Sequence, residues 1–177
     1  YDYTSCFDYI RSYISSADLA IANLEVTLAG PPYTGYPRFS SPDALAAACK
    51  DAGIDVLVTA NNHSVDRGKK GIERTIKILD NLNILHTGTF LSYSDKKKKS
   101  PLIIEKNNFR IALINYTEET NGIPVPAPYH VNIIRKDRLK ADIAEAKKSN
   151  PDAVVLFLHW GIEKQNEPNA NQLALAD

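Results

Sequence analysis

Hydrophobic and polar positions follow two different periods in this chain, and the two periods alternate from one end to the other. Apolar residues at spacings of three and four predict amphipathic helices over residues 7–17, 70–83 and 136–149. Continuous apolar runs bounded by turn residues predict buried strands, most clearly over residues 54–60 and 152–161. Strands that alternate with helices predict an α/β protein whose parallel strands are covered by helices on both faces.

The segments between these elements give weaker signals. Ser41 and Pro42 predict the start of a helix that ends before Gly53, because serine caps helix N-termini and proline fits the first turn. Two apolar runs around Asn107 and Asn108 predict a hairpin, since asparagine tolerates positive φ. The remaining expectations are short strands over 19–22 and 84–88, irregular loops over 29–41 and 121–132, a solvated turn over 91–101 and the start of a helix over 166–177.

Composition narrows the class of protein without identifying it. The length of 177 residues suits a single domain over residues 1–177, and 44% hydrophobic with 24% charged residues is ordinary for a globular protein. The 21 basic residues balance 21 acidic ones, so the net charge indicates neither a nucleic acid nor an anionic membrane as partner. No apolar run reaches the roughly 20 residues that cross a bilayer, and no signal peptide opens the chain.

Cys6 and Cys49 are the only cysteines, and neither lies in a C-x-x-C motif. Cys49 falls within an apolar helical pattern, so two buried free thiols are favoured over a disulfide. A pair of free thiols does not define the compartment in which the protein works.

Polar side chains follow three of the predicted strands at the point where each strand ends. Because ligands of open α/β sheets bind at the carboxyl ends of the strands, we expect these side chains to share one edge of the sheet. A carboxylate, an amide oxygen and an imidazole together suit Mn²⁺, Fe²⁺ or Zn²⁺, and the lack of thiolates argues against a structural zinc site. The side chains are Asn23 and Glu25 after the first strand, Asn61, Asn62, His63 and Asp66 after the second, and His159 and Glu163 after the third.

Each of these residues also fits an ordinary structural role, as an exposed acid, a turn asparagine or a hydrogen-bonded histidine. Asp66 fits the N-cap of the following helix or a group that supports the site. His63 directly follows Asn62, which would place an imidazole beside a metal, ready to protonate a leaving group. His86 and His130 lack this context and are expected to be structural or solvated, although a loop histidine near the site could touch substrate.

Four segments resemble the bacterial poly-γ-glutamate capsule synthesis proteins of the CapA type. They are "ADLAIANLEVTL", "YPRFSSPDAL", "AGIDVLVTANNHSVDRGKKGIERTIKILD" and "LHWGIEKQNEP". The resemblance covers nearly the whole chain, and "ANNHSVDRG" with "HWGIE" is a specific pair of motifs. The family is part of the calcineurin-like metallophosphoesterase superfamily, which implies a four-layer α/β/β/α sandwich with a di-metal centre.

The resemblance also implies roles for individual residues. Asn62 and His63 match an Asn-His pair in which the asparagine binds metal and the histidine helps to neutralise the reacting group. Glu25 matches an acidic residue that binds or bridges the metals, and His159 matches a metal-binding histidine. Glu163 matches the glutamate of the family's H-W-G-x-E motif.

The chain departs from the family pattern in a few places. Asn61 follows Ala60 where the superfamily has a glycine, as is usual in the CapA-type branch, and Lys164 stands where an aromatic residue is common. The family's opening strand, which ends in G-D, and its closing G-H-x-x-H-type segment are both missing. The resemblance therefore implies a partial domain, truncated at both ends, that carries only part of the metal site.

These observations together predict a metal-dependent, hydrolase-like domain that takes part in capsule or poly-γ-glutamate synthesis or processing. We expect it at the bacterial cell envelope, extracytoplasmic and anchored to the membrane by a segment outside this chain. The expected cofactors are divalent ions, two of them in the full-length protein. The expected partners are poly-γ-glutamate or a phosphorylated substrate, and a capsule synthesis complex in the membrane. The residues in these roles are Glu25, Asn62 and His159 as metal ligands, His63 as acid or electrostatic stabiliser, and Asn23, Asn61, Asp66 and Glu163 in support.

Two other functions stay open at this point. A non-catalytic scaffold of the synthesis and export machinery would bind an anionic polymer in the old metal cleft, helped by Lys69, Lys70, residues 96–99 and the tyrosines Tyr33 and Tyr36. A phosphatase of soluble metabolites would have no connection with the capsule. The resemblance does not choose among hydrolysis, transfer to a polymer and a supporting role in export.

Overall fold

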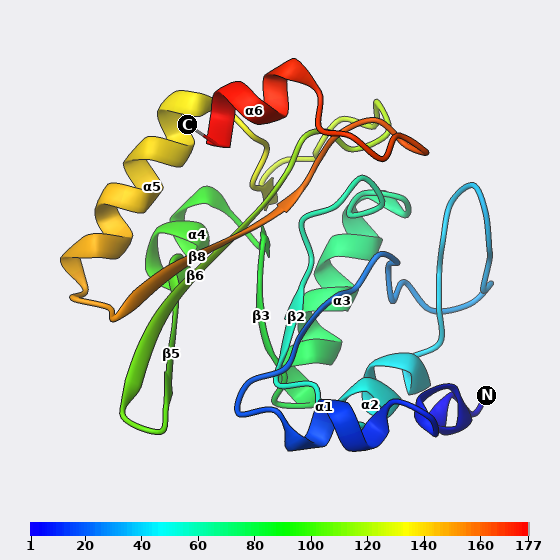
Figure 1. The fold of residues 1–177 in the computed structure, drawn as a ribbon. Helices are drawn as coiled ribbons and strands as arrows, with labels where there is room; N and C mark the ends of the chain where they lie inside the picture. The colour runs from blue at the N-terminus through cyan, green and yellow to red at the C-terminus, as the bar shows by residue number, and fades with distance from the viewer. Residues whose placement is uncertain (177) are drawn as a thin grey trace.

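Two β-sheets pack face to face between layers of helices in the computed structural model, which describes residues 1–176 (Figure 1). The first sheet contains β1 (Ile21–Asn23), β2 (Val56–Val58) and β3 (Leu85–Thr87), all parallel and in that order. All residues of β2 are buried, which confirms the central strand predicted from its β-branched run.

The second sheet has the order β5-β6-β8. Strand β5 (Leu102–Lys106) and strand β6 (Phe109–Thr117) form the predicted antiparallel hairpin, and β8 (Ala153–His159) pairs with β6 in parallel. Asn107 and Asn108 occupy the turn at φ 51° and 63°, as expected for asparagine there.

A short antiparallel pair lies beside the two large sheets. It joins β4 (Thr89–Phe90) to β7 (His130–Val131), so the loop expected over residues 121–132 contains a strand at its end.

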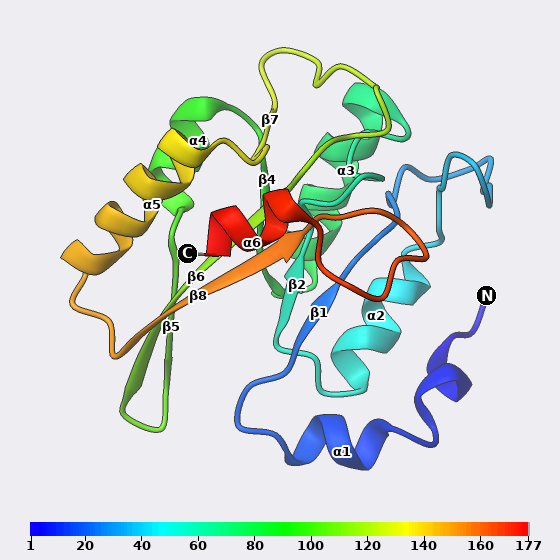
Figure 2. The same ribbon diagram turned by 45° about the horizontal axis from the view of Figure 1, so that its top comes forward.

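The helices form the two outer layers of the sandwich. Those on the first sheet are η1 (Thr4–Phe7), α1 (Arg11–Ser16), α2 (Ala44–Asp51) and α3 (Gly68–Asn81). Those on the second are α4 (Tyr93–Lys99), α5 (Lys136–Lys148) and α6 (Ala170–Ala176), as Figure 2 shows. Leu175 of α6 packs against the hydrophobic cluster that joins α5 to β6. The layer order is therefore α/β/β/α, as the family resemblance implied.

Alternation along β6 explains how one strand serves two hydrophobic layers. Ala112, Ile114 and Tyr116 pack outward against α5, whereas Leu113 packs inward against Val56 and Val58 of the first sheet. On the other side of the molecule, α3 buries Ile72, Ile76 and Leu79, which lie at the three- and four-residue spacing that predicted this helix. None of the helices within residues 1–176 has the length and apolar character needed to cross a bilayer.

Two helical predictions need correction. Residues 7–17 do not form one helix, because the turn η1 and the short α1 divide them, and Tyr9 and Tyr13 are exposed. Helix α2 begins at Ala44 with Asp43 at its N-cap and without a side-chain cap, so Ser41 does not cap it.

The prediction of a solvated turn over residues 91–101 is wrong. Residues 93–99 form α4, capped by Ser92, whose Oγ accepts a hydrogen bond of 3.0 Å from the amide of Asp95. Lys96 in this helix is 7% exposed, and its ammonium lies 2.5 Å from a carboxylate oxygen of Asp142 on α5. The same carboxylate accepts a 2.6 Å hydrogen bond from the Tyr116 hydroxyl, so α4, α5 and β6 share one buried polar cluster.

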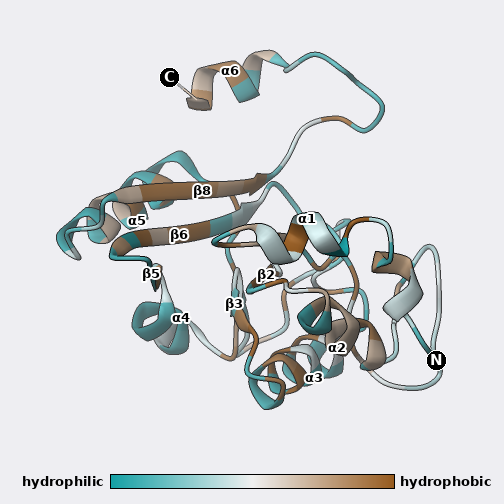
Figure 3. Cartoon of the chain, turned by 60° about the horizontal axis from the view of Figure 1, so that its bottom comes forward, coloured by the Kyte–Doolittle hydropathy of each residue, from teal (hydrophilic) through white to brown (hydrophobic). Residues whose placement is uncertain are grey.

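Strand β8 and one cysteine are less buried than the sequence predicts. Strand β8 is apolar along most of its length (Figure 3), yet it lies at the edge of its sheet, with Val155 36% and Leu156 37% exposed. Cys49 is buried and free, and burial raises the pKa of its thiol. Cys6 is also free but is exposed.

Candidate metal centre

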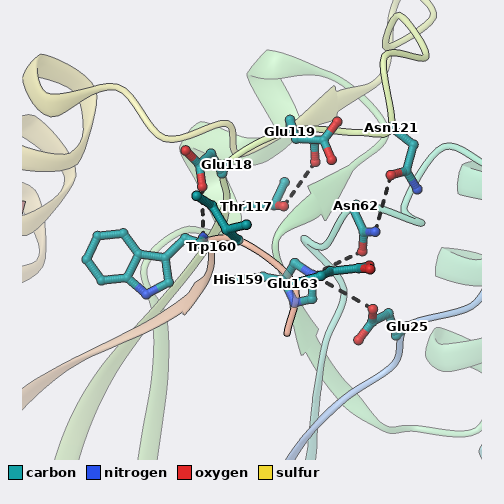
Figure 4. A pocket seen from close by; sticks show the side chains of 11 residues that line it. Glu25, Asn62, Thr117, Glu118, Glu119, Asn121, His159, Trp160 and Glu163 are labelled. Carbon is teal, nitrogen blue, oxygen red and sulfur yellow. Dashed lines mark hydrogen bonds and ion pairs between the residues drawn. The ribbon is translucent and has the colours of Figure 1, made fainter. Parts of the chain in front are cut away.

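Three side chains from strand ends of both sheets meet at one place (Figure 4). Glu25 follows β1, Asn62 follows β2 and His159 is the last residue of β8. His159 Nε2 lies 3.0 Å from Asn62 Oδ1 and 3.8 Å from Glu25 Oε1. The predicted proximity is present, but the three residues come from two facing sheets rather than from one edge of one sheet.

A pocket of about 450 Å³ opens at these residues; we call it the acidic pocket. Its lining contains the carboxylates of Glu25, Glu118, Glu119 and Glu163, and no lysine or arginine among the described residues. Glu163, predicted to support the site, therefore reaches the pocket. Carboxylates that share a pocket without a compensating cation repel one another, which makes the pocket receptive to positive charge.

The amide of Asn62 is held by a residue that the sequence did not single out. Its Nδ2 donates to Asn121 Oδ1 at 3.3 Å, and Asn121 takes a positive φ of 51° in the loop after β6. With the nitrogen engaged on that side, the Asn62 oxygen faces His159. Asn121 and His159 thereby fix the orientation of the Asn62 amide at the pocket.

Asn61 and Asn23 form a hydrogen-bonded relay behind the pocket. Asn61 is fully buried, and its Nδ2 donates to Asn23 Oδ1 at 3.0 Å and to the carbonyl oxygen of Leu24 at 2.9 Å. Asn23 Nδ2 in turn donates to Glu25 Oε2 at 2.8 Å. Neither asparagine lines the pocket, and both position the Glu25 carboxylate that does.

His63 lies beside the acidic pocket and is absent from its lining. Its Nδ1 lies 2.8 Å from Asp66 Oδ2, and its ring packs edge-on against Phe39 at a centroid distance of 4.6 Å. Asp66 Oδ2 also accepts a 2.7 Å hydrogen bond from the Phe39 amide. Helix α3 starts at Gly68 without a side-chain cap, so Asp66 holds His63 and the Phe39 segment instead of capping the helix.

The remaining histidines lie away from these residues. His86 Nε2 is 3.0 Å from Asp80 Oδ1, a structural contact of the predicted kind. His130 lines a different pocket, on the other side of β6.

The loop after β6 contributes pocket residues that sequence reasoning missed. Glu118 Oε2 accepts a 2.8 Å hydrogen bond from the Gly161 amide, which ties this loop to the segment after His159. A signal exists in the sequence, because "IALINYTEE" is an apolar strand that ends in ligand-type side chains like the other three. The hairpin pattern explains this strand only as the second strand of a hairpin. Because β6 also pairs in parallel with β8, its end lies beside His159 at the acidic pocket.

The donors fit a divalent ion through a mixed set of atoms. No three His, Cys, Asp or Glu side chains within residues 1–176 come close enough to hold a metal by themselves. Glu25, His159 and the amide oxygen of Asn62 together make a set of three donor groups. A set of this size leaves coordination positions of a metal ion open, as in catalytic metal sites.

An α/β/β/α sandwich with an Asn-His loop and a strand-terminal histidine at an acidic pocket defines a metallophosphoesterase-like protein. A family model described as "Bacterial capsule synthesis protein PGA_cap" matches residues 1–177, and the chain belongs to this family. The family expected from the sequence motifs is thus confirmed.

Two relatives illustrate the similarity. The chain is 28% identical over 184 residues to "Capsule biosynthesis protein CapA" of Bacillus anthracis, a match that covers 96% of this chain and 44% of the relative. It is 30% identical over 192 residues to "PGA biosynthesis protein CapA" of Bacillus subtilis strain 168, with 97% and 46% covered. The chain therefore spans less than half the length of these relatives.

Proposed function

We propose that this domain binds a divalent cation through Glu25, Asn62 and His159 and performs metal-dependent hydrolysis during synthesis or processing of a capsule polymer at the cell envelope. The observation that carries the proposal is the charge of the acidic pocket. Four carboxylates without a lysine or arginine would repel a phosphate or a carboxylate polymer. A bound divalent cation offsets part of that negative charge and offers a local positive centre to which an anionic substrate can bind.

Each residue has a definite task in this proposal. A divalent ion there supplies a Lewis acid that polarises the scissile bond and lowers the pKa of bound water. Asn121 keeps the Asn62 oxygen directed at the site, and the Asn61–Asn23 relay does the same for Glu25. Asp66 engages Nδ1 of His63, so Nε2 is the nitrogen that would give a proton to a leaving group when the ring is in its imidazolium form.

The charge distribution also separates the catalytic proposal from the scaffold. A scaffold that binds a polyanion in the acidic pocket needs positive charge there. The lining has four glutamates and, among the described residues, no lysine or arginine. The names of the two relatives, a capsule and a PGA biosynthesis protein, support a capsule polymer over a soluble metabolite as the substrate class.

Metal binding by the intact protein tests the proposal directly. Titration with Mn²⁺ or Zn²⁺ in a calorimeter is expected to show a site that Glu25→Gln and His159→Ala each weaken by at least about tenfold, because each removes one of few donors. The matched control is Glu105→Gln, which removes the same charge at the far end of the β5–β6 hairpin. Equal affinities of Glu25→Gln and Glu105→Gln would refute the ligand assignment.

Catalysis is tested with His63→Ala. We expect hydrolysis of a generic phosphodiester to fall by about 100-fold, the usual scale for loss of an acid catalyst, while calorimetry shows the metal affinity unchanged. Unchanged turnover would remove His63 from the mechanism. Failure of the metal-loaded wild-type protein to hydrolyse either a phosphodiester or a capsule polymer would eliminate the hydrolase assignment.

A further inference from the structure

A second pocket of about 440 Å³ lies on the opposite side of β6; we call it the basic pocket. It is formed where α4, the start of α5 and the segment after β7 come together. Residues that define it are Tyr93, Lys96, His130, Asn132, Arg135 and Arg138.

The two pockets are separated by a single stretch of backbone. Tyr116 lines the basic pocket and its neighbour Thr117 lines the acidic pocket, because successive residues of a strand point to opposite faces. Residues 132–134 run alongside: the Thr117 amide donates to the Asn132 carbonyl oxygen at 2.9 Å, and the Ile134 amide donates to the Thr117 carbonyl oxygen at 2.8 Å. The two pockets therefore lie on opposite sides of the same backbone segment.

The charge of the basic pocket is opposite to that of its neighbour. Its lining contains three cationic residues and, among the described residues, no carboxylate. Lys96 is neutralised by Asp142, but Arg135 has no ion pair with any residue of 1–176. Arg138 contacts the Tyr93 hydroxyl at 3.3 Å and comes only within 3.9 Å of the exposed Asp137. Two guanidinium groups thus remain available to an anion.

Other groups around the pocket are consistent with an anionic ligand. The ammonium of Lys97 lies 5.1 Å from the centre of the Tyr93 ring, which adds positive charge at the rim. Burial and the nearby Lys96 ammonium lower the pKa of His130, so its ring is neutral at pH 7. Asp142, the carboxylate that pairs with Lys96, has its oxygens occupied by Lys96 and Tyr116.

Asn132 favours a ligand that carries a hydrogen-bond donor. It is 1% exposed, and its Nδ2 donates to the Asn115 carbonyl oxygen at 3.0 Å. Its Oδ1 is buried and has no hydrogen-bond partner of good geometry within residues 1–176, although the Asn132 side chain lies close enough to His130 to oppose the lowering of the His130 pKa. Buried acceptors in folded proteins are nearly always paired, so a ligand that brings an N–H group would complete this one.

We propose that the basic pocket binds an acidic polyamide chain, with carboxylates at Arg135 and Arg138 and an amide N–H at Asn132. A chain of linked glutamates has both groups in every unit. The inference rests on the proposed function and deepens it, because it places recognition of the polymer on the other side of β6 from the cation site.

The test measures binding of a short glutamate oligomer to the intact protein in the presence of a chelator, so that no metal contributes. The double variant Arg135→Ala/Arg138→Ala is expected to lose at least about tenfold in affinity, as for charge-assisted hydrogen bonds. The control Lys147→Ala/Lys148→Ala removes two charges from the other end of α5 and is expected to change affinity by less than about twofold. An equal loss in the control would overturn the proposal, since binding would then follow net charge alone.

Two further arms separate this inference from its alternatives. Inorganic phosphate that displaces the oligomer at equal concentration would assign the pocket to a phosphate group and overturn the polyamide ligand. Glu25→Gln should keep oligomer binding in chelator while losing metal, and the double arginine variant should show the reverse. Loss of oligomer binding in Glu25→Gln would place the polymer in the acidic pocket and refute the basic pocket, whereas a failure of metal binding alone would refute only the proposed function.

Discussion

Gly88→Ala is expected to destabilise the protein by about 4 kcal/mol or more, because two separate penalties coincide at this residue. Gly88 has φ +113°, a conformation that side chains rarely adopt. A Cβ there would lie 2.0 Å from Asn115 Oδ1 and 2.5 Å from the Ala60 amide nitrogen. The displaced Asn115 amide accepts from the Ala60 N–H and donates to the Phe157 carbonyl oxygen, so the clash would break the polar link between the two sheets.

Two control glycines divide this effect into its parts. Gly122 has φ +68° and open space where a methyl group would stand, so Gly122→Ala should cost about 1 kcal/mol from backbone strain alone. Gly35 has neither a positive φ nor a neighbour within 4 Å of that position, and Gly35→Ala should be neutral. Urea unfolding followed by circular dichroism gives all three values. Equal free energies of unfolding for Gly88→Ala and Gly122→Ala would show that the close approach of Gly88 to Asn115 does not contribute to stability.

Asp142→Ala is expected to cost about 3 kcal/mol or more, the scale for breaking a buried ion pair by removal of one partner. The Lys96 and Asp142 side chains are only 9% and 18% exposed, so water compensates the remaining ammonium poorly. The substitution also leaves the Tyr116 hydroxyl without its 2.6 Å acceptor. Both losses fall on the contacts that join α4, α5 and β6.

The neighbouring lysine provides the comparison for that variant. Lys97 is exposed and in the same helix, so Lys97→Ala should change the free energy of unfolding by less than about 0.5 kcal/mol. Equal urea midpoints for Asp142→Ala and Lys97→Ala would mean that the pair is solvated in solution, as the lysine-rich sequence alone suggests.

Helix α4 shows what local sequence does and does not reveal. A run of four lysines beside serine and aspartate is typical of a solvated turn, and this composition hides the helix. The start signal is nevertheless present, since Ser92 Oγ accepts from the Asp95 amide while the Asp95 carboxylate accepts from the Leu91 amide around the first turn. Burial of Lys96 could not be inferred, because its partner Asp142 is 46 residues away in sequence.

Strand identity was easier to predict than strand neighbours. The apolar run of β8 indicated a strand correctly, but its exposure depends on which strands pair beside it, and that is a tertiary property. The packing of the two sheets against each other is likewise a tertiary property that the local sequence does not reveal. Side chains at strand ends were expected at one edge of one sheet. Packing of Leu113 against Val56 and Val58, with the hydrogen bond between Asn115 and Ala60, sets the two sheets face to face and brings the end of β8 opposite the end of β2.

The candidate site was predictable to the extent that each strand end carries polar residues. Glu25, Asn62 and His159 were selected in this way and lie together. The support around them was harder to see, because Asn121 acts across 59 positions of sequence on Asn62. The charge of the basic pocket was equally hard to predict. Arg135 directly precedes an ordinary amphipathic helix pattern and Arg138 lies within it, and only the fold sets them against Tyr93 and Asn132.

The origin of the three donors has a consequence for the folded state as a whole. Glu25 and Asn62 belong to one half of the sandwich and His159 to the other, so a shared cation would act as a cross-link between halves that otherwise adhere through apolar packing and Asn115. Ligation and resistance to unfolding are then thermodynamically coupled, with about 2.7 kcal/mol gained at a free ion concentration of 100 times Kd. Removal of the ion would then lower the free energy of unfolding as well as the proposed hydrolytic activity.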